Sequence, residues 1–281
     1  MNPWVIRGVI AVVILFLLDR EIYLYEGVHL GPRVQGWLYD RWAAKYDSDK
    51  RASQAHDAVR LAQPLVKALH EAQVAEPFML DVATGTGRLP LVLMQDPAFK
   101  GYIIGLDLSH DMLASAAQKL NAYRDRVTFI RHTAFELPFP DDSFDVVSCM
   151  EALEIMPNME QPLAEFARVL RPGGIFVTTH GTKDLGLWRK VVDADTFRGL
   201  LHAVQFEQIE IEPWWEKFNL VWARKAGTSV PVAHHTITDV LRCPACGAVA
   251  YAFTSDAAPT TLVCGNCQAE KLISEEAIIL F

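Results

Sequence analysis

The chain has 281 residues, 51% of them hydrophobic, so it can bury a sizeable core, and a wholly disordered chain is disfavoured. Its formal net charge of −8 disfavours a broad phosphate-binding surface, and with it nucleic acid as a partner. Four of the five cysteines form two Cys-x-x-Cys pairs near the C-terminus, which favours metal binding in a reducing compartment over disulfides.

Residues 4–18 are apolar except for Arg7. As a helix this run spans about 22 Å, which is short against a hydrocarbon core of about 30 Å. We nevertheless expect residues 1–26 to anchor the chain in the membrane as a single-pass helix. A cleaved signal peptide would need a small-residue cleavage site that the sequence lacks, and a buried core helix is the remaining alternative. Basic residues after the run outnumber Arg7, which predicts a main body facing the cytoplasm.

Residues 27–38 contain three glycines and a proline, a composition typical of a linker. Apolar residues then recur at helical spacing over residues 53–74, which predicts a helix packed on a sheet. Beyond it, strands are expected at residues 78–83, 102–107, 127–132, 144–150, 175–180, 206–211 and 220–224, and helices at 89–95, 111–124, 160–170 and 194–204. This alternation predicts an α/β fold with a parallel sheet covered on both faces, and ligands at the carboxyl ends of its strands.

The first expected strand leads into a glycine-rich turn. Gly85 and Gly87 let backbone N–H groups approach a ligand before a helix begins, as in nucleotide-binding loops, although a purely structural turn is the alternative. About 20 residues further on, the second strand ends in Asp107, whose carboxylate can accept hydrogen bonds from both ribose hydroxyls of a nucleoside. The two features together favour a nucleoside-containing ligand.

Four segments resemble the successive motifs of class I S-adenosylmethionine (SAM) methyltransferases: residues 80–87 (LDVATGTG), 105–113 (GLDLSHDML), 136–145 (ELPFPDDSFD) and 168–174 (RVLRPGG). The likeness is greatest to the group that includes the ubiquinone and menaquinone biosynthesis methyltransferases. This resemblance implies a Rossmann-like, doubly wound seven-stranded sheet with an antiparallel last strand over residues 39–230. It also implies SAM as the cofactor.

The resemblance further implies which residues hold SAM, namely Asp81, Ala83, Gly85, Gly87, Asp107, Leu108, Met112, Thr133, Ala134, Phe135 and Met150. Two of these depart from the family pattern. Ala83 stands where the motif usually has its first glycine, and a methyl group is tolerated there only if φ stays negative. Thr133 stands where many relatives carry an acidic residue that reads adenine, so its hydroxyl does that work or the contact is lost.

Three residues are candidates for catalysis. The stretch around Tyr46 resembles the segment that these methyltransferases place over the cofactor as a lid, although its aromatic residues could instead anchor a helix at a membrane surface. Glu154 follows the fourth strand, where a carboxylate could act as a base or steady the sulfonium charge; a solvated residue at a helix start is the alternative. His180 ends the fifth strand and is either a base at the substrate mouth or a structural histidine.

Residues 238–281 are predicted to form a second unit, a zinc ribbon. Its two knuckles supply four thiolates for one zinc ion, from Cys243, Cys246, Cys264 and Cys267. A ribbon without metal is the alternative. The unit resembles small ribbon proteins that bind and activate methyltransferases, which implies a helper fused in cis and a surface for a protein partner.

The sequence therefore predicts a membrane-anchored SAM-dependent methyltransferase with a C-terminal zinc ribbon. Anchoring points to a lipophilic small molecule as the methyl acceptor, such as a quinone precursor or a lipid. Two other functions stay open. One is a non-catalytic scaffold that keeps the fold, which the departures at Ala83 and Thr133 favour. The other is a protein or RNA methyltransferase whose ribbon holds the substrate, for which the acidic balance is unfavourable to RNA.

Overall fold

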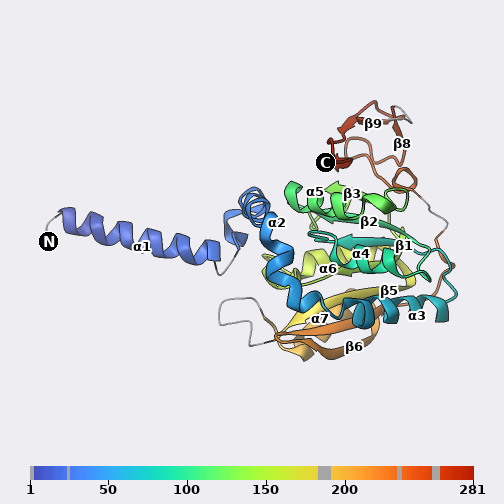
Figure 1. Ribbon diagram of the computed structural model, residues 1–281, viewed down its shortest axis with the longest axis horizontal. Coiled ribbons are helices and arrows are strands. Elements are labelled where there is room, and N and C mark those ends of the chain that lie inside the picture. Colours follow the sequence, from blue (N-terminus) through green and yellow to red (C-terminus); the bar gives the residue numbers. More distant parts are fainter. Residues whose placement is uncertain (1–2, 24–25, 183–190, 233–235, 255–259) are drawn as a thin grey trace.

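Two sheets form the framework of the computed structural model, which describes residues 3–23, 26–182, 191–232, 236–254 and 260–281 (Figure 1). The large sheet contains β1 (Phe78–Val82), β2 (Tyr102–Asp107), β3 (Val127–Arg131), β4 (Phe144–Cys149), β5 (Leu170–Gly181), β6 (Phe206–Trp215), β7 (Phe218–Lys225) and β11 (Ile278–Leu280). The small sheet contains β8 (Tyr251–Phe253), β9 (Thr261–Cys264) and β10 (Glu270–Leu272). The strand orders are β11-β3-β2-β1-β4-β5-β7-β6 and β10-β9-β8.

All seven strands expected from the sequence occur in the large sheet, and β7 runs antiparallel to both of its neighbours. The prediction of a Rossmann-like α/β sheet is therefore confirmed. Its count of strands was too low, because β11 pairs in parallel with β3 at the sheet edge, with Ile278 opposite Phe129. Strand β1 lies between β2 and β4, where the order of the strands reverses. The carboxyl ends of these three strands are where a ligand crevice is expected.

The buried strands feed two hydrophobic cores, one on each face of the sheet. In β1, Phe78 and Leu80 join one core and Met79 joins the other, because successive side chains of a strand point to opposite faces. Helices cover both faces, as a parallel sheet requires. The first core includes residues of α6 (Glu160–Val169) and α7 (Ala194–Ala203), and the second includes residues of α3 (Gln63–Glu71), α4 (Arg88–Gln95) and α5 (His110–Lys119).

Short polar sequences set where these helices begin. The Ser109 hydroxyl caps α5 by accepting a 3.1 Å hydrogen bond from the Met112 N–H, and Asp193 caps α7 by accepting one of 2.9 Å from the Thr196 N–H. Single turns of other helix types join the elements, namely η1 (Val28–Leu30), the π-helical η2 (Ala58–Ala62), η3 (Asn121–Tyr123), η4 (Leu153–Ile155) and η6 (Ile237–Asp239).

Helix α1 (Pro3–Tyr23) extends away from the rest of the chain (Figure 1). Arg7 and Asp19 confine its uncharged run to residues 8–18. Such a run spans about 16 Å of helix, against a hydrocarbon core of about 30 Å. No helix among the described residues is long and apolar enough to cross a membrane. The predicted single-pass membrane helix, and the location drawn from it, are therefore wrong.

The stretch expected to be a linker instead begins helix α2 (Pro32–Gln54). Proline suits the first turn of a helix, because the N–H that it lacks would have no partner inside the helix. A Cβ added at Gly36 would lie 3.3 Å from the Leu108 carbonyl oxygen, so α2 passes close to the chain that follows β2. The helix expected over residues 53–74 is divided among the end of α2, η2 and α3.

The C-terminal segment packs on the large sheet. Ile237, Val240 and Leu241 belong to the same hydrophobic core as Phe78, and the Arg242 N–H donates a 2.9 Å hydrogen bond to the Pro138 carbonyl. After the small sheet, β11 returns to the edge of the large one. The ribbon and the sheet edge therefore share both a core and a strand pair.

Candidate active site

The turn after β1 lies at the carboxyl end of the sheet. Ala83, Gly85 and Gly87 have positive φ values of 53°, 53° and 76°. The expectation that Ala83 would need a negative φ is not met, and an alanine in this left-handed region is less stable than a glycine by about 1–2 kcal/mol. A Cβ added at Gly87 would lie 2.8 Å from a Leu120 methyl carbon and 3.0 Å from the Ala116 Cβ, so a larger residue there would force a neighbouring side chain to shift.

Asp81 lies beneath this turn and does not line the pocket described below. Its Oδ2 accepts a 2.6 Å hydrogen bond from the Thr84 hydroxyl, and its Oδ1 accepts one of 2.5 Å from the Ser148 hydroxyl on β4. Burial raises the pKa of Asp81 to about 6, although both hydroxyls act in the opposite direction. The carboxylate therefore ties the glycine turn to the neighbouring strand.

Asp107 ends β2 beside the glycine turn. Its Oδ2 accepts a 2.9 Å hydrogen bond from the Gly85 N–H, and its Oδ1 accepts another of 2.9 Å from the Ser109 N–H. Burial raises the pKa of Asp107 above its usual value, against the effect of these two N–H groups. A carboxylate oxygen can accept more than one hydrogen bond, so both oxygens remain able to receive a ligand hydroxyl.

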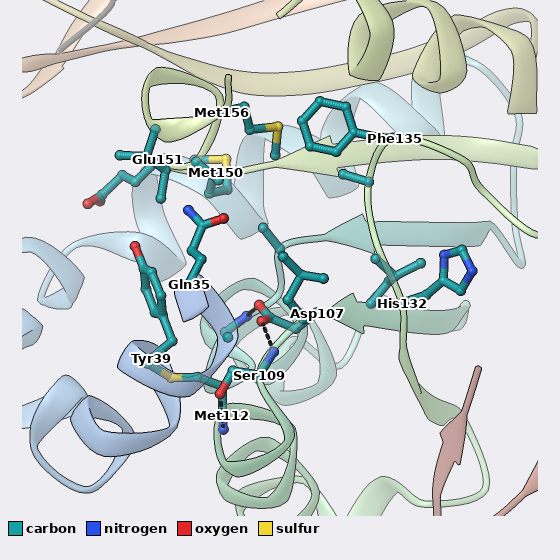
Figure 2. Close-up of a pocket in the computed structure, with 18 of the residues that line it drawn as sticks. Gln35, Tyr39, Asp107, Ser109, Met112, His132, Phe135, Met150, Glu151 and Met156 are labelled. Atoms are coloured by element: carbon teal, nitrogen blue, oxygen red, sulfur yellow. Dashed lines mark hydrogen bonds between the residues drawn. The ribbon is translucent and has the colours of Figure 1, made fainter. Parts of the chain in front are cut away.

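Asp107 faces a pocket of about 720 Å³, a volume that includes its open mouth (Figure 2). It brings together these predicted residues: Tyr46, Ala83, Gly85, Asp107, Leu108, Met112, Ala134, Phe135 and Met150. Its other lining residues were not predicted from the sequence as site residues: Gln35, Gly36, Tyr39, Leu106, Ser109, His132, Glu151, Ala152, Ile155 and Met156. Figure 2 shows Tyr39 and His132 on opposite sides of Asp107, with the methionines at positions 150 and 156 and Phe135 at the far end. The pocket therefore has a polar part around Asp107 and an apolar part.

Helix α2 is held across the pocket by its acidic residues. Asp40 accepts a 2.6 Å hydrogen bond from the Ser109 hydroxyl. Two helical turns later, Asp47 accepts a 2.5 Å hydrogen bond from the Thr86 hydroxyl. Asp47 also forms a 2.7 Å ion pair with Lys119. Since residues seven apart lie on one face of a helix, both carboxylates point the same way. This arrangement supports the lid expected around Tyr46.

Glu151, directly after β4, is the charged lining residue that the sequence analysis missed. It forms ion pairs of 2.8 Å with Lys50 of α2 and 2.6 Å with Arg88 of α4. Burial raises the pKa of Glu151, but the two cations outweigh it and the pKa lies below its usual value. Arg88 also forms a 2.5 Å ion pair with Asp57, so two acidic and two basic side chains balance one another in a partly buried network. A signal did exist, because Glu151 follows a strand end just as Asp107 does.

Four predicted residues other than Asp81 lie outside the pocket lining. Glu154 is buried, with 4% of its surface exposed. His180 donates from Nε2 to the Val192 carbonyl at 2.8 Å and accepts at Nδ1 from the Asn219 amide at 3.2 Å, which favours the structural alternative. The Thr133 hydroxyl accepts a hydrogen bond from the Phe135 N–H at 3.3 Å. Gly87 starts helix α4.

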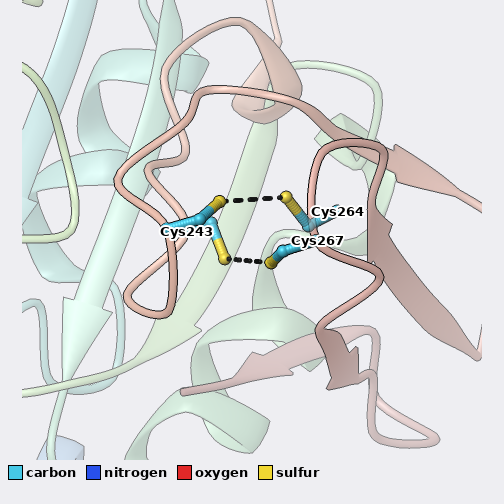
Figure 3. A group of neighbouring side chains, drawn as sticks. Cys243, Cys264 and Cys267 are labelled. Carbon is cyan, nitrogen blue, oxygen red and sulfur yellow. Dashed lines mark hydrogen bonds between the residues drawn. The ribbon is translucent and has the colours of Figure 1, made fainter.

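The four C-terminal cysteines come together as predicted (Figure 3). Their sulfur atoms all lie within 4.8 Å of one another, with Cys243 and Cys267 at 3.6 Å and Cys246 and Cys264 at 3.7 Å. None of the four forms a disulfide. Zinc–sulfur bonds of about 2.3 Å in a tetrahedron place the sulfurs about 3.8 Å apart, so this donor set fits a structural zinc ion.

Comparison with known proteins identifies the central part of the chain. Residues 80–178 match the family described as Methyltransferase domain. The demethylmenaquinone methyltransferase of Symbiobacterium thermophilum is 33% identical over 148 residues, which are 52% of this chain and 58% of that protein. The chain thus spans less than two thirds of the length of this relative. The expectation of a SAM-dependent methyltransferase domain is confirmed.

Solved structures agree on the fold. The CurJ carbon methyltransferase superposes with a TM-score of 0.54 at 17% identity, covering 63% of this chain and 58% of that one. A chain from the complex between the Haloferax volcanii Trm112 methyltransferase activator and a candidate methyltransferase superposes with a TM-score of 0.51 at 22% identity, covering 67% of this chain and 98% of that one. At such identities the likeness speaks for the Rossmann-like fold alone.

Proposed function

We propose that this chain transfers the methyl group of SAM to a lipophilic acceptor of the quinone-precursor type, aided by a zinc ribbon in cis. The observation that carries the proposal is the Asp107 carboxylate, fixed by the N–H groups of Gly85 and Ser109 at the base of the pocket. Two adjacent ribose hydroxyls can donate to its two oxygens. The predicted SAM-binding residues that line the pocket would then lie around an adenosine, with Met150 towards the apolar end.

SAM, when bound, would supply a sulfonium methyl group whose carbon a nucleophile attacks in line, with the thioether S-adenosylhomocysteine as the leaving group. The chain's own residues would align the reactants and exclude water. Burial raises the pKa of Tyr46 well above its usual value, so its hydroxyl keeps its proton and can donate a hydrogen bond. The positive charges of Lys50 and Arg88 lower the pKa of Glu151, so its carboxylate stays ionised. A carboxylate with a lowered pKa is a weak base, so Glu151 cannot serve as a strong base. Rate enhancement would therefore come mainly from alignment and desolvation.

This chemistry favours an acceptor that is itself nucleophilic, such as the electron-rich ring of a reduced quinone precursor. The apolar end of the pocket supports the same choice, because the flexible, polarisable thioethers of Met150 and Met156 line it together with Ile155. The similarity to a demethylmenaquinone methyltransferase is consistent with it. Tyr46 remains the candidate for orienting the acceptor.

The proposed zinc ion would be held by Cys243, Cys246, Cys264 and Cys267, and its chemistry would be structural, since four thiolates close the coordination sphere. The ribbon would support the methyltransferase domain through β11, which covers the edge of β3. A structural neighbour from a complex with a methyltransferase activator makes an activating role for this ribbon a natural proposal. Metal-free purification should yield about one zinc per chain, and less than about half an equivalent would contradict the metal assignment.

Two measurements test the proposed function. Calorimetry with SAM and with S-adenosylhomocysteine should show binding of both at a single site per chain. Incubation of the purified protein with methyl-tritiated SAM and a cell extract should then label a product that partitions into organic solvent. Binding without transfer would instead support the non-catalytic scaffold, and labelled protein or RNA would support a macromolecular acceptor.

A further inference from the structure

The side-chain amide of Gln35, on helix α2, is a polar group that the rest of the site does not use. Gln35 lines the pocket, and Figure 2 shows its side chain pointing from α2 towards Met150. Its backbone N–H donates a 3.1 Å hydrogen bond to the Gly31 carbonyl, but its amide has no hydrogen-bond partner in the part of the chain that the structure describes. An amide in such a place can serve a ligand.

Contacts next to Gln35 fix the segment of α2 that carries it. Gly36 is buried, and a Cβ added there would lie 3.3 Å from the Leu108 carbonyl oxygen, so α2 approaches the chain after β2 closely at this point. About one turn further on, the Asp40 carboxylate accepts the 2.6 Å hydrogen bond from the Ser109 hydroxyl. The Gln35 side chain therefore lines the pocket from a stretch of backbone that is held in place.

Two other polar side chains of the pocket lining are already bound to partners. The Tyr39 hydroxyl, one turn after Gln35 on the same face of α2, donates a hydrogen bond to the Glu26 carboxylate. The Glu151 carboxylate is held by its ion pairs with the lysine of α2 and the arginine of α4. A new partner for either group would replace an existing one, whereas the Gln35 amide can bind a polar group of the acceptor without such a loss.

We infer that the Gln35 amide binds a ring hydroxyl of the acceptor, the one next to the ring carbon that takes the methyl group. The inference rests on the proposed function, since it names the polar group that the same site recognises in an electron-rich aromatic acceptor. The amide suits this task because its Oε1 can accept a hydrogen bond from a hydroxyl. The ring itself would lie against Met150 and Met156, whose thioethers make favourable contacts with aromatic rings.

The hydrogen bond to Gln35 would strengthen during methyl transfer. The ring carbon forms a bond to the methyl carbon while the bond from that carbon to sulfur breaks, and S-adenosylhomocysteine leaves. The ring thereby gains the positive charge of the sulfonium, and the adjacent hydroxyl takes up part of it and becomes a stronger donor towards Oε1. Loss of the ring carbon's own hydrogen, as a proton to water, then restores the aromatic ring.

The first test measures binding of two probes that differ at one group, 1-naphthol and 1-methylnaphthalene, to the full chain saturated with S-adenosylhomocysteine. Gln35→Met keeps the length of the side chain and removes both of its hydrogen-bonding groups. Calorimetry should show that this variant binds 1-naphthol about fivefold or more weakly than the wild type, the size of one lost hydrogen bond, and binds 1-methylnaphthalene within about twofold of the wild type. Gln118→Met, at an exposed position on α5, is the matched control and should change neither affinity.

The second test measures transfer from methyl-tritiated SAM to 1,4-dihydroxynaphthalene, kept reduced with ascorbate. Gln35→Met should lower kcat about tenfold, because the hydrogen bond that strengthens in the transition state is lost. Its affinity for S-adenosylhomocysteine should stay unchanged. Gln35→Glu keeps an accepting oxygen and should retain more than about a third of the wild-type kcat.

The possible failures separate the inference from the proposed function. Wild-type behaviour of Gln35→Met, an equal loss of affinity for both naphthalene probes, or weaker binding of S-adenosylhomocysteine by this variant would each overturn the inference and leave the proposed function standing. A wild type that binds S-adenosylhomocysteine but neither binds 1-naphthol nor methylates the dihydroxynaphthalene would contradict the aromatic acceptor, and with it the inference. If the wild type did not bind S-adenosylhomocysteine, the proposed function itself would fail.

Discussion

Lys50 and Glu151 form a 2.8 Å ion pair that joins helix α2 to the residue after β4, although they are 101 positions apart in the sequence. Glu151 adopts a positive φ of 53° and its N–H donates a 2.7 Å hydrogen bond to the Thr179 hydroxyl, so its backbone is held in place while its carboxylate faces helix α2. The pair therefore links the position of α2, the expected lid, to the part of the pocket where the methyl group is expected to lie.

This relationship predicts that Glu151→Gln weakens SAM binding by about fivefold and destabilises the fold by about 1–3 kcal/mol, because a hydrogen-bonded charge is lost beside two partly buried cations. Calorimetry and chemical unfolding measure the two effects. The control is Glu71→Gln, which removes the exposed, 3.8 Å pair with Lys67 and should change neither quantity. Equal behaviour of the two variants would show that Glu151 does not hold the lid.

Asp107→Ala should weaken SAM binding about tenfold or more, since two ribose hydroxyls would lose a charged acceptor worth about 1.5–3 kcal/mol. Asp125→Ala, at an exposed position just before β3 and away from the pocket, serves as the control for the loss of a carboxylate. An unchanged dissociation constant in folded Asp107→Ala protein would remove the cofactor assignment from this residue.

Ala83→Gly should raise the free energy of unfolding by up to about 1 kcal/mol, because glycine adopts the positive φ of 53° at this position without steric strain. Ala152→Gly is the matched change at another lining residue whose φ of −129° is ordinary, and it should destabilise the protein. Unfolding by urea measures both. A stabilising Ala152→Gly with a destabilising Ala83→Gly would contradict the conformation described for the glycine turn.

Asp81 should make stability fall as pH rises through its titration. Its pKa is about 6 in the folded protein and 3.8 for an unperturbed aspartate, so the folded state binds the extra proton between these values. The stabilisation from this group is complete below about pH 4 and lost above about pH 6, a change on the order of 3 kcal/mol. Asp81→Asn removes this dependence. The difference in unfolding free energy between wild type and variant should therefore shift by that amount from pH 4 to 7, and a constant difference would show that Asp81 titrates normally.

Removal of zinc should loosen the edge of the large sheet as well as the ribbon. Cys264→Ser removes one of the four zinc ligands, so the free energy of zinc binding no longer stabilises the folded ribbon. Residues 278–280, which follow the ribbon and pair with β3, can then detach from the sheet edge. Hydrogen exchange should then become faster in residues 127–131 and 278–280. Strand β1, which lies between β2 and β4, is the internal control and should keep its protection. If only residues 243–267 lost protection, β11 would be shown to hold the edge without the ribbon.

The sequence by itself determined the features that are local in the chain. The strands were predictable because each is a short run of apolar residues. Gly85 and Asp107 were predictable because Gly85 closely follows such a run and Asp107 ends one. The cluster of four cysteines was equally predictable, because two Cys-x-x-Cys pairs are typical of a four-thiolate metal site whatever the surrounding fold.

Only the tertiary structure decided features that join distant segments. The pairing of β11 with β3, the contact of Phe281 with His132 and the ion pair of Lys50 with Glu151 each depend on chain packing, for which a three-residue strand or a single charge carries no periodic signal. The apolar run near the N-terminus was over-interpreted for a different reason, because the sequence itself already limits the uncharged run to residues 8–18, between Arg7 and Asp19. Ala83 is the clearest case, since its left-handed backbone is imposed by Thr84, whose N–H donates to the Leu106 carbonyl and whose hydroxyl donates to Asp81.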